Sequence, residues 1–504
     1  MPDILLIILD TQRRDRLSIY GHPQATSPHL DEFAADATLF ERAIAPAQWT
    51  VPSHASMFTG LYPSTHQVTQ ATSKLSGSYP TLAEILQADG YHTAGFCNNP
   101  LVGVLDTGLT RGFSEFFNYA GAAPNRPVDI TRSKARRKIS QEWGRFARHV
   151  SQYFAQSDWL FRVSLNAAIT PLWTRWVNYK GNTARSIDDL IAYHQEKRST
   201  DQPMFLFLNL MGAHMPYHPP QDYIKRFAPD VDKAAYRFIN RFNADAARWA
   251  SPVEQPPSEW ENHIIDGFYN AEVAHQDYHL GRLLRYLKAS GALEDTMVII
   301  AADHGEGHGD HSFFGHSFVV YQELVHVPLM IAYPDKFPAN QRVQTNVSTR
   351  RIFHTVLDVA GIKPPIDESD PNADIEALSL YQPESEKNLA FAEAFPPSTL
   401  LNVVQHRQPH LVEPLRLTHV RRGVYQDSHK LAVADHHIEG LFDIAADPAE
   451  HINIQNQHST LADSMQDKLS AFVQMAEHYR ADGDHQGNVS PDVIDNLRAL
   501  GYIE

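Results

Sequence analysis

Cysteine, long apolar runs and positive charge are all scarce in this chain of 504 residues. The single cysteine, Cys97, excludes an intrachain disulfide, which suits a reducing compartment, so a cytoplasmic location is expected. No apolar run reaches the roughly 18 residues that a membrane-spanning helix needs, and we expect no membrane span. The apolar residues 4–9 follow no basic segment and stop at Asp10, so no signal peptide is expected either.

Acidic residues outnumber basic residues by 59 to 43, which gives a formal net charge of −16. Such a chain repels the phosphate backbone, so we expect no non-specific binding to nucleic acid. A small anionic ester stays compatible with this charge if a metal ion or a basic cluster reverses the local field. The size and ordinary globular composition indicate a large core, and a symmetric homo-oligomer is compatible with them.

Three short apolar runs end in polar side chains. Residues 4–9 lead to Asp10, residues 205–210 lead to His214, and residues 297–300 lead through two alanines to Asp303. Runs without alternation predict strands buried on both faces of a parallel sheet, which binds ligands beyond the carboxyl ends of its strands. The leucines at 280, 283, 284 and 287 share one face of a predicted helix that closes at Gly291. We therefore predict an α/β fold with a mainly parallel central sheet flanked by helices.

The chain is predicted to contain two domains. Residues 383–387 (PESEK) resemble a linker between a catalytic α/β domain at 1–382 and a smaller C-terminal α+β domain at 388–504, which ends in a helix over 461–479. Residues of about 120–200 are rich in basic and aromatic side chains. They predict an amphipathic helical insertion over the site, with a helix for a membrane surface or a partner protein as the alternative.

Two of the predicted strand ends supply candidate metal ligands. Asp10 and the adjacent Asp303 and His304 combine carboxylates with an imidazole, which suits Mn²⁺, Mg²⁺, Ca²⁺ or Zn²⁺. Thr50 could complete the set, since coordination lowers the pKa of an alcohol and makes it a nucleophile. Taken alone, Asp10 could instead cap a helix. The segment DHGEGHGDH carries six His, Asp and Glu residues, and that density favours metal binding.

The segment TVPSH predicts a helix start that suits an anion. Ser53 could cap the helix, whose N-terminal amides and dipole favour a tetrahedral anion. The simpler interpretation is an ordinary loop before a capped helix. Candidate anion ligands or general acids are then His54, His214 and His316.

Taken in order, these segments resemble the sulfatase branch of the alkaline phosphatase superfamily. DTQRRDRLSIYG is similar to the family's first metal-binding segment, and TVPSHASMFTGLYPSTH stands where its Cys/Ser-x-Pro-x-Arg signature belongs. The later matching segments are AGFCNNP, HMPYHPP, YNAEVAHQDYHLGRLLRYL with DTMVIIAADHGE, FGHSFVVYQELVHVPLMI and GLFDIAADPAEHINI. The resemblance implies an alkaline-phosphatase-like sandwich with a smaller C-terminal α+β domain.

The resemblance also implies roles for single residues. The metal ligands would be Asp10, Thr50, Asp303 and His304, with Thr50 also the nucleophile. Substrate contacts would come from Asn99, His214 and His316. One divalent ion is expected, with Mn²⁺ favoured; Thr11 stands where the family often has a second acidic ligand. Four further residues could either bind a second metal ion or form a hydrogen-bonded shell around the first: His218, His308, Asp310 and His311.

Thr50 stands where sulfatases carry the Cys or Ser that becomes formylglycine. Threonine cannot form that aldehyde, so no formylglycine is expected, and a sulfated threonine would lack a second hydroxyl with which to expel the sulfate. A phosphorylated threonine can be released by in-line attack at phosphorus. His54 in place of arginine and His316 in place of lysine exchange fixed charges for titrating groups, which suits a substrate with one negative charge.

The resulting prediction is a metal-dependent hydrolase of phosphate diesters or phosphonate monoesters that uses Thr50 as its nucleophile. One alternative is a sulfate ester hydrolase without formylglycine, in which activated water attacks and Thr50 only binds the metal. A second is a transferase that moves a phosphoryl headgroup to an alcohol, although such relatives are usually membrane-anchored. A third is a non-enzymatic binding protein, which the intact ligand set disfavours.

Overall fold

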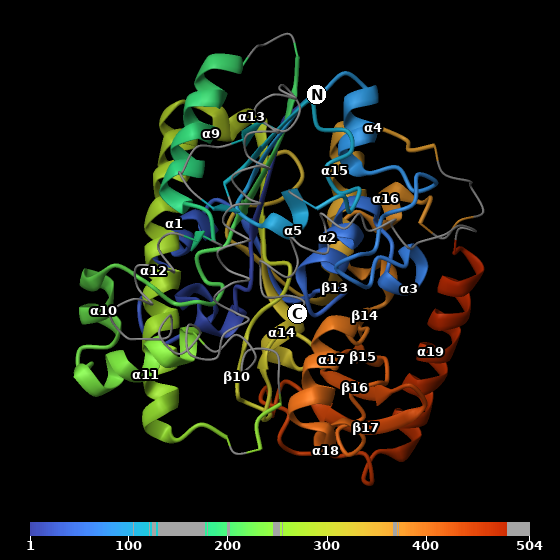
Figure 1. Ribbon diagram of the computed structural model, residues 1–504. Coiled ribbons are helices and arrows are strands. Elements are labelled where there is room, and N and C mark those ends of the chain that lie inside the picture. Colours follow the sequence, from blue (N-terminus) through green and yellow to red (C-terminus); the bar gives the residue numbers. More distant parts are fainter. Residues whose placement is uncertain are drawn as a thin grey trace.

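A nine-stranded sheet forms the centre of the computed structural model, in the order β13-β2-β12-β9-β1-β8-β3-β4-β6 (Figure 1). The structure describes residues 1–103, 105–119, 121–122, 128–129, 177–178, 180–198, 202–244, 252–254, 256–365, 370 and 372–480. The strands of this sheet are β1 (Asp3–Leu9), β2 (Thr38–Ile44), β3 (His92–Cys97), β4 (Glu115–Asn118), β6 (Val128–Asp129), β8 (Met204–Leu210), β9 (Thr296–Ala301), β12 (His326–Ala332) and β13 (Gln341–Ser348).

Most neighbouring strands of this sheet are parallel. β1 lies between β8 and β9 and is parallel to both, and β3 is parallel to β8 and β4. β12 is antiparallel to both of its neighbours, and β6 is antiparallel to β4. The predicted α/β fold with a mainly parallel central sheet is confirmed, and the three apolar runs of the sequence are its three central strands.

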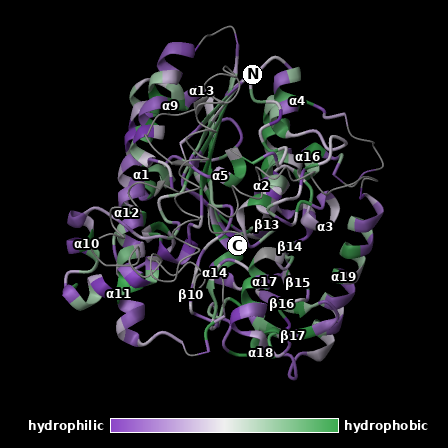
Figure 2. Cartoon of the chain, viewed as in Figure 1, coloured by the Kyte–Doolittle hydropathy of each residue, from purple (hydrophilic) through white to green (hydrophobic). Residues whose placement is uncertain are grey.

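Alternate residues of β1 face two separate hydrophobic layers. Ile4, Leu6 and Ile8 pack with residues of α2 (Thr50–Thr59), α4 (Leu82–Ala88) and α15 (Ile352–Ala360). Leu5, Ile7 and Leu9 pack with residues of α1 (Pro28–Ala34), α9 (Thr183–Lys197) and α12 (Glu259–Ala289). Both faces of the strand are therefore buried, which explains its unbroken apolar sequence. Figure 2 shows the hydrophobic residues gathered along the sheet between these helix layers.

The predicted helix with four leucines on one face is α12, in which all four leucines are buried. Gly291 follows it with a φ of 70°, the left-handed conformation that glycine adopts without strain. Among the described residues, the other α-helices are α3 (Pro63–His66), α5 (Pro100–Gly103), α10 (Gln221–Phe227), α11 (Lys233–Ala244), α13 (Ala292–Asp295), α14 (Gln322–Val325), α16 (Ile375–Leu378), α17 (Ser398–Arg407), α18 (Pro409–Val412) and α19 (Ser459–His478). Over the described part of the chain, none of the helices has the length and apolar character required to cross a bilayer.

A second, four-stranded antiparallel sheet lies toward the C-terminus, at the bottom of Figure 1. Its strands are β14 (Leu389–Ala394), β15 (Arg421–Gln426), β16 (His429–Ala434) and β17 (His437–Asp443). α19 packs on it through Met465, Leu469 and Phe472. The PESEK segment forms a 3-10 helix, Pro383–Glu386, whose Pro383 carbonyl accepts a hydrogen bond from buried Arg351. The domain boundary at 382–388 stays a prediction, and most of the insertion predicted at 120–200 lies outside the described residues.

His311 ties the segment after β9 to the C-terminal part of the chain. It lies in the turn between the short strands β10 (Gly307–His308) and β11 (Phe314–Gly315). Its Nδ1 donates to Glu323 and its Nε2 donates to the Ala449 carbonyl, both at 2.9 Å. Both partners are acceptors, so both contacts are satisfied only when both ring nitrogens carry a proton, which favours the cationic imidazole. Burial opposes this charge, but the Glu323 carboxylate holds the pKa of His311 above its usual value.

The raised pKa of His311 predicts a pH-dependent stability. A raised folded-state pKa stabilises the fold fully below the unfolded value of about 6.5. That contribution disappears as the pH rises through the folded-state pKa. His311→Gln should therefore lower the melting temperature more at pH 6 than at pH 9. The loss in the free energy of unfolding should be larger at pH 6 by about 1–2 kcal/mol. Thermal unfolding at both pH values measures this, with the exposed His410 changed to Gln as the control. An equal loss at both pH values would contradict it.

Candidate active site

The carboxyl ends of four adjacent strands carry the polar side chains of the site. Asp10 directly follows β1, Asp303 follows β9, Asn99 follows β3, and Asn209 is the last residue but one of β8. Because β9, β1, β8 and β3 are parallel neighbours, their carboxyl ends meet at one edge of the sheet. The fold thus brings together residues that lie up to about 290 positions apart in the sequence.

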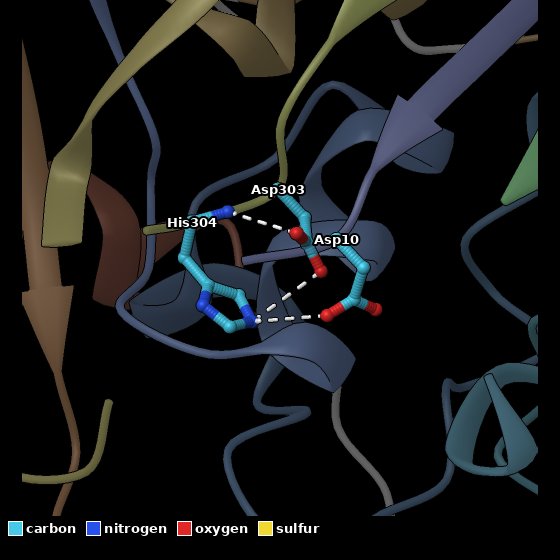
Figure 3. Close-up of side chains that lie close together, drawn as sticks. All are labelled: Asp10, Asp303 and His304. Carbon is cyan, nitrogen blue, oxygen red and sulfur yellow. Dashed lines mark hydrogen bonds and ion pairs between the residues drawn. The ribbon is translucent and has the colours of Figure 1, made fainter. Parts of the chain in front are cut away.

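Asp10, Asp303 and His304 converge on one point (Figure 3). His304 Nε2 lies 3.4 Å from Asp303 Oδ2 and 4.0 Å from Asp10 Oδ1. All three side chains are fully buried. Burial and the neighbouring Asp10 carboxylate raise the pKa of Asp303 well above its usual range, and burial lowers the pKa of His304. Among the described residues, these three form a group in which one ligand atom from each side chain lies within 4.8 Å of the others, close enough to hold a metal ion.

The bonding of these residues fits a divalent cation. Asp10 Oδ1 and Asp303 Oδ2 are buried and have no hydrogen-bond partner, although a buried carboxylate oxygen needs compensation. The His304 Nδ1–H donates to the Gly305 carbonyl at 2.8 Å, which leaves the Nε2 lone pair directed into the site. Two hard oxygens and one imidazole nitrogen match the ligands of Mn²⁺, Mg²⁺ or Zn²⁺. The predicted metal ligands Asp10, Asp303 and His304 are thus placed together.

Thr50 adjoins this group and begins α2. Its Oγ1 lies 3.2 Å from His304 Nε2 and 3.4 Å from Asn99 Nδ2, and its side chain is almost fully buried. Asn99 Nδ2 also donates to Asp10 Oδ2 at 2.6 Å. Thr50 stands at the N-terminus of a ten-residue helix, where the dipole favours negative charge on its oxygen. Thr50 and Asn99, both predicted for the site, lie at the ligand group.

Ser53 does not have the predicted capping role. The helix begins at Thr50 instead, and Ser53 lies in its first turn and donates to the Asp303 carbonyl at 2.7 Å. The prediction of a Ser53 cap is therefore wrong. Pro52 is tolerated in this first turn because its missing N–H would have no partner inside the helix.

His54 adjoins the ligand group from the next turn of α2. Its Nδ1 lies 2.9 Å from the Thr50 carbonyl and 3.4 Å from Asp303 Oδ2, while its Nε2 lies 3.4 Å from Asn209 Nδ2. Burial lowers the pKa of His54, so the neutral ring is favoured. Protein groups face both nitrogens, an arrangement that fixes Thr50 and Asp303 in place. The acid or base role of His54 stays a prediction.

His214 and His316 lie next to each other, and the His316 ring adjoins that of His304. The ring centroid of His316 is 5.3 Å from that of His214 and 4.4 Å from that of His304. Burial opposes a charge on His316, but Glu306 accepts from its Nδ1 at 2.8 Å and raises its pKa. Burial lowers the pKa of His214, whose Nδ1 donates to the Met215 carbonyl. The two imidazoles are therefore biased toward different protonation states.

Thr11, His308 and Asp310 form hydrogen bonds or ion pairs with other protein groups. The Thr11 hydroxyl donates to the Asp10 carbonyl at 2.7 Å, and its N–H faces Asp303 Oδ1 at 3.3 Å. His308 lies between Tyr217 and Asp266, and Asp310 pairs with buried Arg13. Whether these residues bind a second metal or belong to a hydrogen-bonded shell around the first stays a prediction.

The profile of the family described as Sulfatase matches residues 2–362. The chain is a member of the sulfatase family. A second profile, N-sulphoglucosamine sulphohydrolase, C-terminal, matches residues 309–475. Membership makes this chain a hydrolase of ester bonds, in a family that generally binds a divalent metal ion.

Named relatives cover most of this sulfatase-family chain. Arylsulfatase K of Bos taurus is 25% identical over 491 residues, which span 94% of this chain and 82% of the relative. The ulvan-active sulfatase of Formosa agariphila is 26% identical over 396 residues, which span 75% and 68%. The crystal structure of the phosphonate monoester hydrolase of Agrobacterium radiobacter has a TM-score of 0.66 at 22% identity, over 95% of this chain and 96% of that one. This last likeness shows the shared fold.

Two residues of the site, Glu306 and Asn209, were not predicted from the sequence. Asn209 carried a usable signal, since it is the one polar residue in the apolar run FLFLNL of β8. Glu306 carried a weaker one, as one of several acidic residues in DHGEGHGDH. Its contact with His316 follows from the pairing of Gly307 with Gly315, which sets residues 306 and 316 opposite each other.

Proposed function

We propose that this sulfatase-family hydrolase cleaves phosphate diesters or phosphonate monoesters, with Thr50 as the nucleophile and one divalent cation, Mn²⁺ in first place, as the cofactor. The proposal depends on one observation: Thr50 Oγ1 lies 3.2 Å from His304 Nε2, in the ligand group where sulfatases carry formylglycine. Thr50, Asp10, Asp303 and His304 would hold the cation. When bound, it lowers the pKa of a coordinated hydroxyl and offsets charge on phosphoryl oxygens.

The side chains around Thr50 have protonation states that fit two-step phosphoryl transfer. In the first step, Thr50 reacts as its alkoxide after its hydroxyl proton has passed to solvent, and Oγ1 forms a bond to phosphorus while the bond from phosphorus to the leaving oxygen breaks. His316, whose pKa the Glu306 carboxylate raises against the effect of burial, would donate its Nε2 proton to that oxygen. In the second step, water attacks phosphorus, and a histidine accepts the proton of the water as Thr50 is released. The lowered pKa of His214 makes its neutral ring available for that step.

A sulfate ester hydrolase without formylglycine is the second candidate. The names Arylsulfatase K and ulvan-active sulfatase of the two relatives favour it. A sulfated Thr50 would have no hydroxyl with which to expel the sulfate, so water would have to attack sulfur directly. Thr50 would then bind the metal without forming a covalent bond.

Four p-nitrophenyl esters distinguish the two candidates. The protein is stripped of metal, supplied with Mn²⁺ or Zn²⁺, and assayed on a phosphate monoester, a phosphate diester, a phenylphosphonate and a sulfate. We expect turnover only after metal is added back, with kcat/KM for the diester or the phosphonate at least about tenfold above that for the sulfate, a difference of about 1.4 kcal/mol. A sulfate preference of the same size would instead support the second candidate.

A further inference from the structure

The loop between β8 and α10, which carries His214, is held on both sides of that histidine by α12. The Gly212 N–H donates to Gln276 Oε1 at 2.7 Å, and the His218 N–H donates to Glu272 Oε1 at 2.7 Å. Glu272 and Gln276 are one turn apart on the same face of α12 and are both buried. The 31-residue helix therefore serves as a rigid support for the loop.

Lys180 joins this support from a different part of the chain. Its Nζ donates to Glu272 Oε1 at 2.8 Å and to the Pro216 carbonyl at 3.0 Å. The side chain of Lys180 is 16% exposed and that of Glu272 is 6% exposed, so the ion pair is largely shielded from water. One ammonium group thus connects α12 to the middle of the loop, two residues beyond His214.

The orientation of the His214 ring depends on that part of the loop. The ring is held by its own Nδ1–H bond to the Met215 carbonyl, directly before Pro216. A shift of Pro216 therefore moves the acceptor that fixes the ring, and with it the imidazole, whose centroid lies 5.3 Å from that of His316. A displacement of even about 1 Å at a catalytic group is costly for turnover.

We infer that Lys180 is a positioning residue for this reaction: its ammonium group, paired with Glu272, fixes Pro216 and through it the imidazole of His214. The inference rests on the proposed role of His214 at the transferred group. The ammonium supplies two directed hydrogen bonds at once, which a neutral side chain of the same length cannot do. The bond to Glu272 also keeps that carboxylate in the geometry that binds the His218 N–H.

The test is a double-mutant cycle in the metal-loaded, full-length protein, with a p-nitrophenyl phosphate diester as the probe. Lys180→Met should lower kcat/KM about tenfold, mainly in kcat, with the metal content unchanged. In a His214→Ala background the same change should have less than about a twofold effect, because the group that Lys180 positions is gone. Lys180→Arg, which keeps the charge and the donors, should recover most of the activity. Lys288→Met removes an exposed lysine paired with Asp36 and serves as the control.

An equal loss in both backgrounds would overturn the inference, since it would mean that Lys180 acts independently of His214. Full activity of Lys180→Met would overturn it too. If Lys180→Met does not fold, the cycle is run with Glu272→Gln, which keeps an oxygen acceptor but removes the charge that holds Lys180. If the native protein cleaves only the sulfate ester, the proposed phosphoryl function fails, and the same cycle with p-nitrophenyl sulfate still tests Lys180.

Discussion

Thr50→Ala should lower the metal-dependent hydrolysis of a phosphate diester at least about 1,000-fold, because it removes the atom that forms the bond to phosphorus. Removal of a nucleophile abolishes the covalent route, and only direct attack by water remains. The loss should appear in kcat, since the proposed substrate contacts of Asn99, His214 and His316 are retained. Steady-state kinetics with the metal content of each sample measured alongside would establish it.

Thr50→Ser is the matched control for this change. Serine keeps the hydroxyl at the start of α2 and loses only the methyl group, so it should retain activity within about tenfold of the native protein. Intact mass must show that the serine is unmodified. Rapid quenching of the native enzyme with the diester should also trap on Thr50 a phosphoryl group that still carries the ester substituent that does not leave. Sulfate turnover that survives in Thr50→Ala would reject the nucleophile role and favour attack by metal-activated water.

The sequence was sufficient to predict the parts of the site that depend on strand order. β1, β8 and β9 are unbroken apolar runs, and parallel strands present their carboxyl ends at one edge, so the proximity of Asp10 and Asp303 could be expected. The resemblance to sulfatases added the order of the segments, and the match over residues 2–362 confirms the family. The roles of the single residues stay predictions until they are measured.

The features of the site that the sequence did not predict depend on very short strands or on contacts between distant residues. Neither leaves a periodic pattern in the sequence. β10 and β11 have two residues each, too few for a strand pattern, yet their pairing is what aligns Glu306 with His316. Lys180 and Glu272 are 92 positions apart, and nothing in the local sequence indicates that either is buried. Ser53 was predicted as a cap because serine is a common N-cap, whereas α2 starts three residues earlier.

Asp303→Asn should change activity and metal-free stability in opposite directions. In the metal-free protein, Asp303 Oδ2 and Asp10 Oδ1 are buried carboxylate oxygens without hydrogen-bond partners, and burial together with Asp10 raises the pKa of Asp303. Asparagine keeps Oδ1, which accepts from the His304 N–H, and replaces the uncompensated oxygen by a donor. We expect the metal-free variant to be more stable than the native protein by about 1–2 kcal/mol at pH 7.5.

The same substitution removes a proposed ligand, so the variant should lose the stabilisation that metal provides. For the native protein this gain is about 2.7 kcal/mol when the metal is at 100 times its Kd. Thermal unfolding with and without Mn²⁺ measures both effects, and diester turnover should fall at least about 1,000-fold. Asp310→Asn is the control, because Asp310 is paired with Arg13 and its loss should lower stability in both states. If Asp303→Asn destabilises the metal-free protein as Asp310→Asn does, the carboxylates of Asp10 and Asp303 do not destabilise the metal-free state, and this prediction is wrong.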